Sequence, residues 1–565
     1  MKRITKLDWM LLLGLIVLYT LLALFRLGSL SAPVHHWKPG AQGESVVLDL
    51  GRETNVSRIY MYEGLGNGAY YYRYSNTPNG PWKDGVTFEV KEVFKWTSMN
   101  TNFKARYIML VVKNKGAEIK EIALVEAGKT VPISGITVHA YTQIGKWEGT
   151  PNNLLDEQNT FEYAVSFMTG TYFDEIYHAR TAYEYIHHIE PYENTHPPLG
   201  KVIIALGISI FGMNPFGWRI MGTIFGIIMI PVIYIFALRL FKKTEYAFLA
   251  AFLMTFDFMH FAQTRIATID TYVVLFIMLM YYFMYRFHTA STIKEETKML
   301  FASGLFFGLA CASKWIGIYG GAGLAILFLV FFIGKIRHRS AQEGVQQFYV
   351  SDTLIGCLFY FIILPAVIYL LSYIPFMLVP GPGHGLKEVL SYQAHMFLYH
   401  YTLTATHPFS SPWWSWPIIL RPVWLYMGID LPSGMISSIV TMGNPAIWWA
   451  GILAVFGTLY LAYKRKDRIM FTVLIAFFFQ YFPWMFISRT LFIYHFFSSV
   501  PFIILCIVYC FKDRIEHHPS WRKWMFVYMG VVLLLFILFY PVLSGMVVPQ
   551  IYRDTFLKWF GSWVF

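Results

Sequence analysis

The 565-residue chain has few charged residues and almost no cysteine. Charged residues make up 14% of it, whereas soluble domains carry about a quarter. With 56% hydrophobic residues, this shortage excludes an ordinary soluble protein and indicates a polytopic α-helical membrane protein. The four cysteines all lie inside apolar runs and suggest neither a disulfide framework nor a zinc site: Cys311, Cys357, Cys506 and Cys510.

The chain also lacks a recognisable signal-peptide cleavage site after its first apolar run. A short basic segment precedes Trp9–Phe25, as in a signal peptide, but the run is long. We therefore expect residues 1–31 to form a retained first transmembrane helix with a cytoplasmic N-terminus. A cleaved signal peptide is the less favoured alternative.

Residues 32–136 have a different composition. Short alternating runs such as VVLDL and ARYIMLVV are separated by turn signals such as GNG and NTPNGPW. This pattern predicts an all-β domain. The order LDLG, YRYSNTPNGPW, ARYIMLVV, EIALVEA resembles a discoidin-like jelly roll, inserted after the first helix on the extracytoplasmic side. Modules of this kind often bind glycans, and a spacer without a ligand is equally consistent with the sequence.

Apolar runs dominate the rest of the chain. Val202–Phe211 is too short to cross a hydrocarbon core of about 30 Å, so we expect an interfacial helix there. Together with the first helix, the longer runs predict about eleven transmembrane helices, at residues 217–240, 245–263, 269–287, 299–313, 316–335, 353–378, 444–463, 469–487, 490–511 and 524–546. The expected regions are a catalytic membrane domain at 137–443 and a C-terminal four-helix region at 444–565.

The positive net charge of +12 supports this topology and does not require nucleic acid. All five loops that the count places in the cytoplasm are basic, as the positive-inside rule requires: 239–243, 286–298, 335–339, 464–468 and 512–523. Counting 202–211 as a span would invert every later loop. The external side then holds the segments 173–201, 264–271, 380–442 and 488–495, joined by the turn at 314–315.

The first of these external segments is dense in titratable groups. Asp174 and Glu175 suit general-base work on a hydroxyl, in which one carboxylate takes the proton while the other orients it or holds a cation. An ordinary acidic helix start is the alternative. His187 and His188 have loosely plausible metal-ligand spacing with nearby glutamates, but no signature such as HExxH is present. Hydrogen-bonding roles are therefore favoured for the histidines.

Other external segments hold candidates for binding. Arg265, Asp270 and Arg489 lie at turns near the outer membrane boundary, where an arginine suits the phosphate of a lipid carrier. Snorkelling arginines are the alternative. The Trp-rich loop contains Trp413, Trp414, Trp416 and Trp424, which form either a lid over a sugar site or an interfacial aromatic belt.

The motifs taken in order carry a family resemblance. FDEIYH, THPPLGK, FDFMHFAQTRIATIDTY, SKWIG, HPFSSPWWSWPIILRPVWLY, GNPAIWW and SRTLFIYHF follow the order seen in protein O-mannosyltransferases, which are C-type membrane glycosyltransferases. The resemblance covers nearly all of residues 171–511. Eukaryotic members carry a trefoil domain in a later loop; nothing here resembles it, and the jelly-roll insert is a departure. The chain resembles a bacterial member.

The resemblance implies inverting transfer of mannose from a polyprenyl-phosphate donor to Ser or Thr hydroxyls of exported proteins at the cell membrane. It implies Asp174 as the base with Glu175 in support, and Arg265 and Arg489 as cations for the lipid phosphate. It suggests site-shaping roles for His196, Lys314, His407 and Arg421. A divalent cation is left open, and no cofactor is assigned.

Two other functions compete with protein mannosylation. A related lipid-linked-sugar transferase could modify a cell-envelope lipid or polymer, as aminoarabinose transferases do with a similar external acidic loop. A membrane-anchored glycan-binding or transport protein would use the β-domain as its receptor. The many predicted spans argue against the second, because a mere anchor needs only one.

Overall fold

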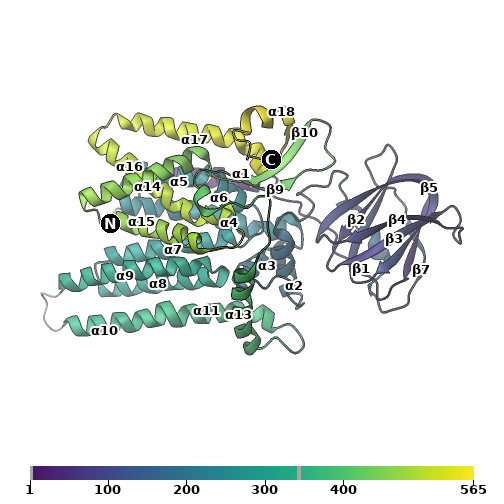
Figure 1. Cartoon of the computed structure of the whole chain (residues 1–565), viewed down its shortest axis with the longest axis horizontal. Helices are drawn as coiled ribbons and strands as arrows, with labels where there is room; N and C mark the ends of the chain where they lie inside the picture. The colour runs from purple at the N-terminus through teal and green to yellow at the C-terminus, as the bar shows by residue number, and fades with distance from the viewer. Residues whose placement is uncertain (1–3, 340–344) are drawn as a thin grey trace.

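The computed structural model describes residues 4–339 and 345–565. Lys2 and Arg3, which contribute to the basic N-terminal segment, lie outside the described residues. The molecule consists of a long helical bundle with a separate β-domain beyond one end of it (Figure 1). The described chain begins at the opposite end of the bundle from the β-domain.

The β-domain is one antiparallel sheet. Within residues 37–149, all of which are described, eight strands pair in the order β4-β3-β5-β2-β6-β1-β8, with β7 against β2. Their bounds are β1 Trp37–Lys38, β2 Ser45–Glu63, β3 Gly68–Ser75, β4 Lys83–Val90, β5 Lys95–Asn114, β6 Ile119–Glu126, β7 Thr137–Thr142 and β8 Glu148–Gly149. The sheet thus continues past the boundary expected at residue 136. The all-β class is confirmed, and the discoidin-like detail stays a prediction.

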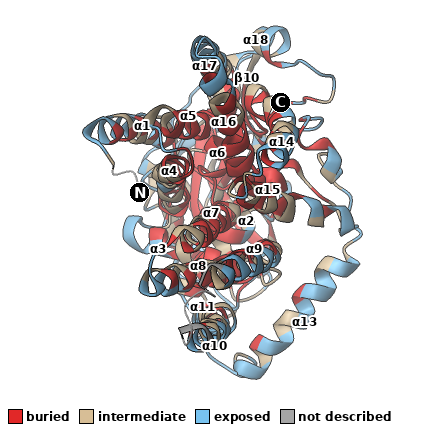
Figure 2. Cartoon of the chain, turned by 90° about the vertical axis from the view of Figure 1, so that its left-hand side faces the viewer, coloured by how far each residue is buried: buried red, intermediate tan, exposed pale blue. Residues whose placement is uncertain are grey.

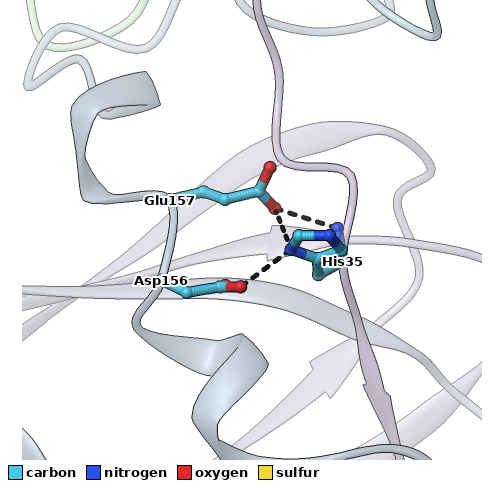
Figure 3. A group of neighbouring side chains, drawn as sticks. All are labelled: His35, Asp156 and Glu157. Carbon is cyan, nitrogen blue, oxygen red and sulfur yellow. Dashed lines mark hydrogen bonds and ion pairs between the residues drawn. The ribbon is translucent and has the colours of Figure 1, made fainter.

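The entry and exit of the β-domain are tied together (Figure 3). Glu157 Oε2 accepts hydrogen bonds from the backbone N–H groups of Val34 (2.7 Å) and His35 (2.9 Å). His35 Nδ1 lies 2.7 Å from Asp156 Oδ2. These contacts hold the two chain segments that connect the β-domain to the bundle side by side.

The bundle contains helices at every predicted span. They are α1 Lys6–Leu24, α4 Pro215–Phe241, α5 Thr244–Thr255, α6 Phe258–Gln263, α7 Asp270–Thr289, α8 Ile293–Ser313, α9 Ile316–Arg339, α10 Val345–Leu358, α11 Leu364–Ser372, α14 Pro445–Arg465, α15 Met470–Tyr481, α16 Val500–His517 and α17 Trp521–Ser544. Among the described residues, seven helical segments are long and apolar enough to cross a membrane. The protein is therefore multi-pass; the count of eleven stays a prediction.

Short helices lie across the end of the bundle that faces the β-domain (Figure 1). They are α2 Glu175–Ile186, α3 Leu199–Phe211 and α13 Leu386–Thr402. The 13 residues of α3 span about 20 Å, so α3 is too short to cross a bilayer. Figure 2 shows α13 at the side of the buried bundle core, with much of its surface exposed.

The β-domain is anchored to the bundle at two places. Arg58 on β2 makes a bidentate ion pair with Asp430, with both N–O distances 2.9 Å. Asp430 lies between β9 Val423–Met427 and β10 Met435–Thr441. On the other side, the Phe94 ring packs against Tyr183 of α2, with centroids 5.2 Å apart. The domain is therefore joined to the segment that carries the acidic pair.

Candidate functional site

The two adjacent carboxylates, Asp174 and Glu175, lie in different environments. Phe173 adopts a left-handed backbone conformation (φ 49°) just before them. Asp174 then occupies the N-cap position of α2, and Glu175 is the first helical residue. Glu175 is fully buried, whereas Asp174 is partly exposed. The pair therefore divides into an inward and an outward carboxylate.

Glu175 is held by a buried arginine. Arg219 of α4 donates from Nε to Glu175 Oε1 and from Nη2 to Glu175 Oε2, both at 2.7 Å. Both side chains are 0% exposed. Glu175 Oε1 also accepts from the backbone N–H of Ala267 (3.1 Å), in the turn before α7. A charge this deep is tolerated because it is paired and its lone pairs are used.

The remaining N–H groups of the Arg219 guanidinium donate to backbone carbonyls. Nη1 donates to Leu27 O (2.9 Å) and Phe167 O (2.8 Å), and Nη2 donates to Gly170 O (2.9 Å). These acceptors belong to the segment after α1 and the segment before α2. The ion pair thus joins four separate parts of the chain, and both oxygens of Glu175 accept hydrogen bonds.

The Asp174 carboxylate has no partner in the described part of the chain. Among residues 4–339 and 345–565, no group hydrogen-bonds or ion-pairs with its carboxylate. Burial and the nearby Asp270 carboxylate raise the pKa of Asp174 to about 7, against the opposing effect of Lys314. Asp270 is itself paired with Lys314, Oδ1 to Nζ, at 2.7 Å. A carboxyl group with a pKa near neutrality is well suited to general-base catalysis.

Lys314, the partner of Asp270, also lines a cavity of about 300 Å³. His196, Lys314 and Arg489 line the cavity together with aromatic side chains, among them Tyr319 and Trp484. Within the described part of the chain, the Arg489 guanidinium has no hydrogen-bond or ion-pair partner. An arginine left unpaired in a cavity can bind a phosphate with two parallel hydrogen bonds.

The histidines of the site are neutral near pH 7. Burial lowers the pKa of His196 despite its contact with Glu193, and burial lowers the pKa of His400 to about 3. The His196 and His400 rings lie 5.1 Å apart. Glu193 instead pairs with the fully buried Lys201, whose Nζ also donates to the backbone oxygens of Glu193 and His196, both at 3.0 Å. The THPPLGK turn is therefore fixed by a lysine.

Arg265 lies away from the cavity. It donates to the backbone oxygens of Ala23 (3.0 Å), Phe25 (2.7 Å) and Arg26 (2.9 Å), where α1 ends. Cationic groups stabilise the C-terminal carbonyls of a helix. This placement does not support the expected contact between Arg265 and a lipid phosphate.

The Trp-rich loop packs beside the cavity. Thr490, next to Arg489, hydrogen-bonds Ala405 O, and the His407 ring packs on Phe492 (5.1 Å). The Trp413 ring packs on Tyr481 (5.3 Å), and Arg421 donates to Pro408 O (2.9 Å) from an exposed position. Trp416 is fully buried and Trp414 is exposed. These contacts give this part of the loop a fixed shape. The tryptophans, His407 and Arg421 do not line the cavity, whereas Phe397, His400 and Tyr401, earlier in the same segment 380–442, do.

The possible metal ligands of the acidic stretch have separate partners. Glu184 pairs with Arg180 (2.8 Å), and Glu190 pairs with His384 (2.5 Å). His187 stacks beside Tyr183 (4.1 Å). Hydrogen-bonding roles thus fit these residues better than a shared metal. Among the described residues, two groups of His and carboxylate side chains are close enough to share one ion, and both lie in or next to the β-domain. In one of them, Glu157 already accepts hydrogen bonds from backbone N–H groups.

Sequence reasoning missed several residues of the site. Arg219 lies inside an apolar run and was counted only as part of a span, although an ionisable residue there is itself a signal. Lys201 was read only as part of a turn. Tyr494 packs against Phe173 (6.3 Å) and lies 5.9 Å from Lys314 Nζ; nothing distinguished it from the other aromatics.

The chain is similar to known glycosyltransferases. A model described as dolichyl-phosphate-mannose-protein mannosyltransferase matches residues 195–369, and one described as the C-terminal four-TMM region of protein-O-mannosyltransferase matches residues 385–563. Together they cover more than half of the chain. Asp174 and the β-domain lie outside both matched ranges.

Curated relatives and a solved structure agree with these matches. A polyprenol-phosphate-mannose–protein mannosyltransferase of Mycolicibacterium smegmatis is 26% identical over 461 residues, covering 69% of this chain and 87% of the relative. A protein of the same name from Corynebacterium glutamicum is 27% identical, covering 65% and 81%. The S. cerevisiae protein O-mannosyltransferase Pmt1-Pmt2 complex bound to the sugar donor has a TM-score of 0.60 at 12% identity, covering 70% and 89%. This structural similarity shows that the chain and the S. cerevisiae protein share a fold.

The buried ion pair predicts a large difference between the two acidic residues. Glu175→Gln should lower the free energy of unfolding by about 3–5 kcal/mol, because it leaves the buried Arg219 without a counter-charge. Asp174→Asn is the matched control and should change stability little, because Asp174 makes no bond that would be lost. Chemical denaturation in detergent micelles measures both. Equal stability of the two variants would contradict the structural role of Glu175.

Proposed function

The chain belongs to the protein O-mannosyltransferase family, and we propose that it transfers mannose from a polyprenyl-phosphate-mannose donor to Ser or Thr hydroxyls of exported proteins. It is a membrane glycosyltransferase acting in protein O-mannosylation. The site is assigned from one observation, which is that the adjacent carboxylates Asp174 and Glu175 lie in different environments. One carboxylate is paired with Arg219. The other has no partner among the described residues and lies close enough to Lys314, which lines the cavity that contains Arg489, to feel its charge.

Asp174 acts as the general base. As the acceptor oxygen attacks C1 of the sugar, Asp174 takes the hydroxyl proton, and the bond from C1 to the phosphate oxygen breaks with inversion. The pKa of about 7 places the carboxylate close to the optimum for this transfer. Glu175 supports the reaction by fixing the start of α2 through Arg219, and so positions Asp174.

Cations stabilise the departing lipid phosphate. The phosphate leaves as a stable anion, so it needs positive charge and no proton. Arg489 is the phosphate contact we favour, because its guanidinium lies in the cavity without a partner. Lys314 lies between the cavity and Asp270, where it stabilises the phosphate and keeps the Asp174 pKa from rising further. His196 shapes the cavity as a neutral donor or acceptor.

The site faces the outside of the cell membrane. Two observations support this orientation. The basic C-terminal end of α9 and the basic connection between α16 and α17 lie at the end of the bundle opposite the β-domain (Figure 1). Asp174 lies at the β-domain end. By the positive-inside rule, the β-domain and Asp174 are extracytoplasmic. A glycan ligand of the β-domain stays a prediction from its sequence.

Asp174→Asn should abolish most of the transfer. General-base catalysis contributes a factor of about 100 or more, so kcat should fall at least that far while donor binding is retained. The assay uses purified protein in lipid nanodiscs, polyprenyl-phosphate mannose and a Thr-containing peptide, with product detected by mass spectrometry.

Arg52→Gln, at an exposed position of the β-domain outside the cavity, is the matched control and should retain activity. Undiminished transfer by Asp174→Asn would overturn the base assignment. Transfer to a lipid or polymer of the cell envelope, with no transfer to peptide by the unmodified protein, would overturn the choice of acceptor.

The activity should depend on pH through Asp174. Because the base must be ionised, kcat/KM should be constant above pH 7 and fall about tenfold per unit below the pKa of about 7. Asp270→Asn removes the like charge that raises this pKa, so the acidic limb should move to lower pH. Lys314→Met removes the opposing cation and should move it to higher pH. An unchanged limb in both variants would contradict this electrostatic arrangement.

The orientation can be tested by labelling with a membrane-impermeant maleimide. Lys115→Cys, exposed in the β-domain, should react in intact cells. Lys464→Cys, exposed at the end of α14, should react only after the cells are permeabilised. The unsubstituted chain, with buried or half-buried cysteines, provides the background. The reverse pattern would overturn the proposed sidedness.

A further inference from the structure

A second cavity lies between the β-domain and α2. It has a volume of about 480 Å³, within the range of small ligand sites. One wall comes from the β-domain, at the facing ends of β3, β4 and β5, and includes Asn67, Lys91 and Asn114. The other wall is formed by Tyr177 and Arg180 of α2 with Tyr192. It shares no lining residue with the cavity that contains Arg489.

The two walls are held in place by contacts beside the cavity. The Thr171 N–H donates to Phe94 O (3.1 Å). Lys120 Nζ lies 5.8 Å from the centroids of both the Phe94 and Tyr183 rings. Because the β-domain is joined to α2 here, the cavity is bounded by packed elements on both sides.

An exposed aromatic surface forms the α2 wall. The Tyr177 and Tyr192 rings are parallel within 3°, with centroids 6.1 Å apart, and are 39% and 55% exposed. The Arg180 guanidinium lies 3.9 Å from the Tyr192 ring centroid and is fixed by Glu184. Tyrosines held in this way offer a large contact area at little cost in conformational entropy.

The charges around the cavity are compensated internally. Arg180 pairs with Glu184, and Lys91 pairs with Glu89. Asn67 and Asn114 are exposed on the β-domain wall, and each amide can both donate and accept hydrogen bonds. Paired charges, amides and aromatic rings favour a neutral polypeptide backbone over a phosphate or another anion.

The cavity lies within reach of the base. Tyr177 follows Asp174 by three residues, and residues at this spacing are neighbours on one side of a helix. One helical turn is about 5 Å long, and an extended chain advances about 3.3 Å per residue. A polypeptide whose hydroxyl is at Asp174 therefore reaches the Tyr177 side of the cavity within about two or three residues.

We propose that this cavity binds an extended segment of the acceptor polypeptide next to the Ser or Thr that receives the sugar. The proposal rests on the proposed function, because it requires a protein acceptor. It assigns the β-domain a part in acceptor binding. Tyr177 and Tyr192 form the contact surface, and Asp174 receives the proton from the hydroxyl beyond it.

The test compares a long and a short acceptor with one variant. For a peptide of about ten residues, long enough to enter the cavity, Tyr192→Ala should raise KM about tenfold. For a blocked tripeptide with the same threonine, KM should be unchanged, and kcat should be unchanged for both. Tyr141→Ala removes an equally exposed ring on β7 (59% exposed) that lies outside the cavity, and should leave both acceptors unaffected.

A cross-linking measurement covers the case in which Tyr192→Ala does not fold. Lys91→Cys, at the cavity, should cross-link to a peptide carrying a bromoacetyl group near its threonine, and Lys115→Cys should not. An equal KM change for both acceptors, or equal cross-linking at both cysteines, would overturn the proposal. Inhibition of the long peptide alone by a free mannose oligomer would also overturn it, in favour of a glycan. If the proposed function itself is wrong, the unmodified protein glycosylates neither peptide, and this result differs from all of the outcomes above.

Discussion

The site depends on one buried ion pair, between Glu175 and Arg219. A charge in a membrane protein interior is costly unless it is paired and fully hydrogen-bonded. Here the guanidinium contacts the carboxylate with two donors and the carbonyls of Leu27, Phe167 and Gly170 with the others. The geometry is satisfied only when the end of α1, the start of α2, α4 and the α6–α7 turn are all in place.

This pair also explains how two neighbouring carboxylates differ in chemistry. The helix starts between them, so one side chain faces inward to the arginine and the other faces outward. The inward carboxylate gains a permanent counter-charge. The outward carboxylate has lost part of its hydration and faces Asp270, which together bring its pKa to about 7. One dipeptide therefore provides an anchor and, in the proposed mechanism, the base.

Helix positions and the acidic pair could be read from the sequence because both depend on local composition. Long apolar runs and basic loops indicate where helices lie, and every predicted span contains helix, although 245–263 is divided between α5 and α6. Which group each charged residue binds could not be predicted from the sequence, because it depends on contacts between residues far apart in the chain. Arg265 and Arg489 look alike in sequence, yet one binds the end of α1 and the other lines a cavity. The role of Arg219 could not be predicted either, because the residue lies within an apolar run that indicates only a transmembrane helix.

The chain order of the ion pair has a consequence for biosynthesis. An arginine is costly in an isolated membrane helix, by up to about 3 kcal/mol at the helix centre, and Arg219 lies near the start of α4. Glu175 precedes Arg219 in the chain, as do the carbonyls of Leu27, Phe167 and Gly170 that the arginine binds. When α4 leaves the ribosome, all of these partners have already been synthesised. This fully buried arginine is thus made only after the carboxylate and carbonyls that it binds.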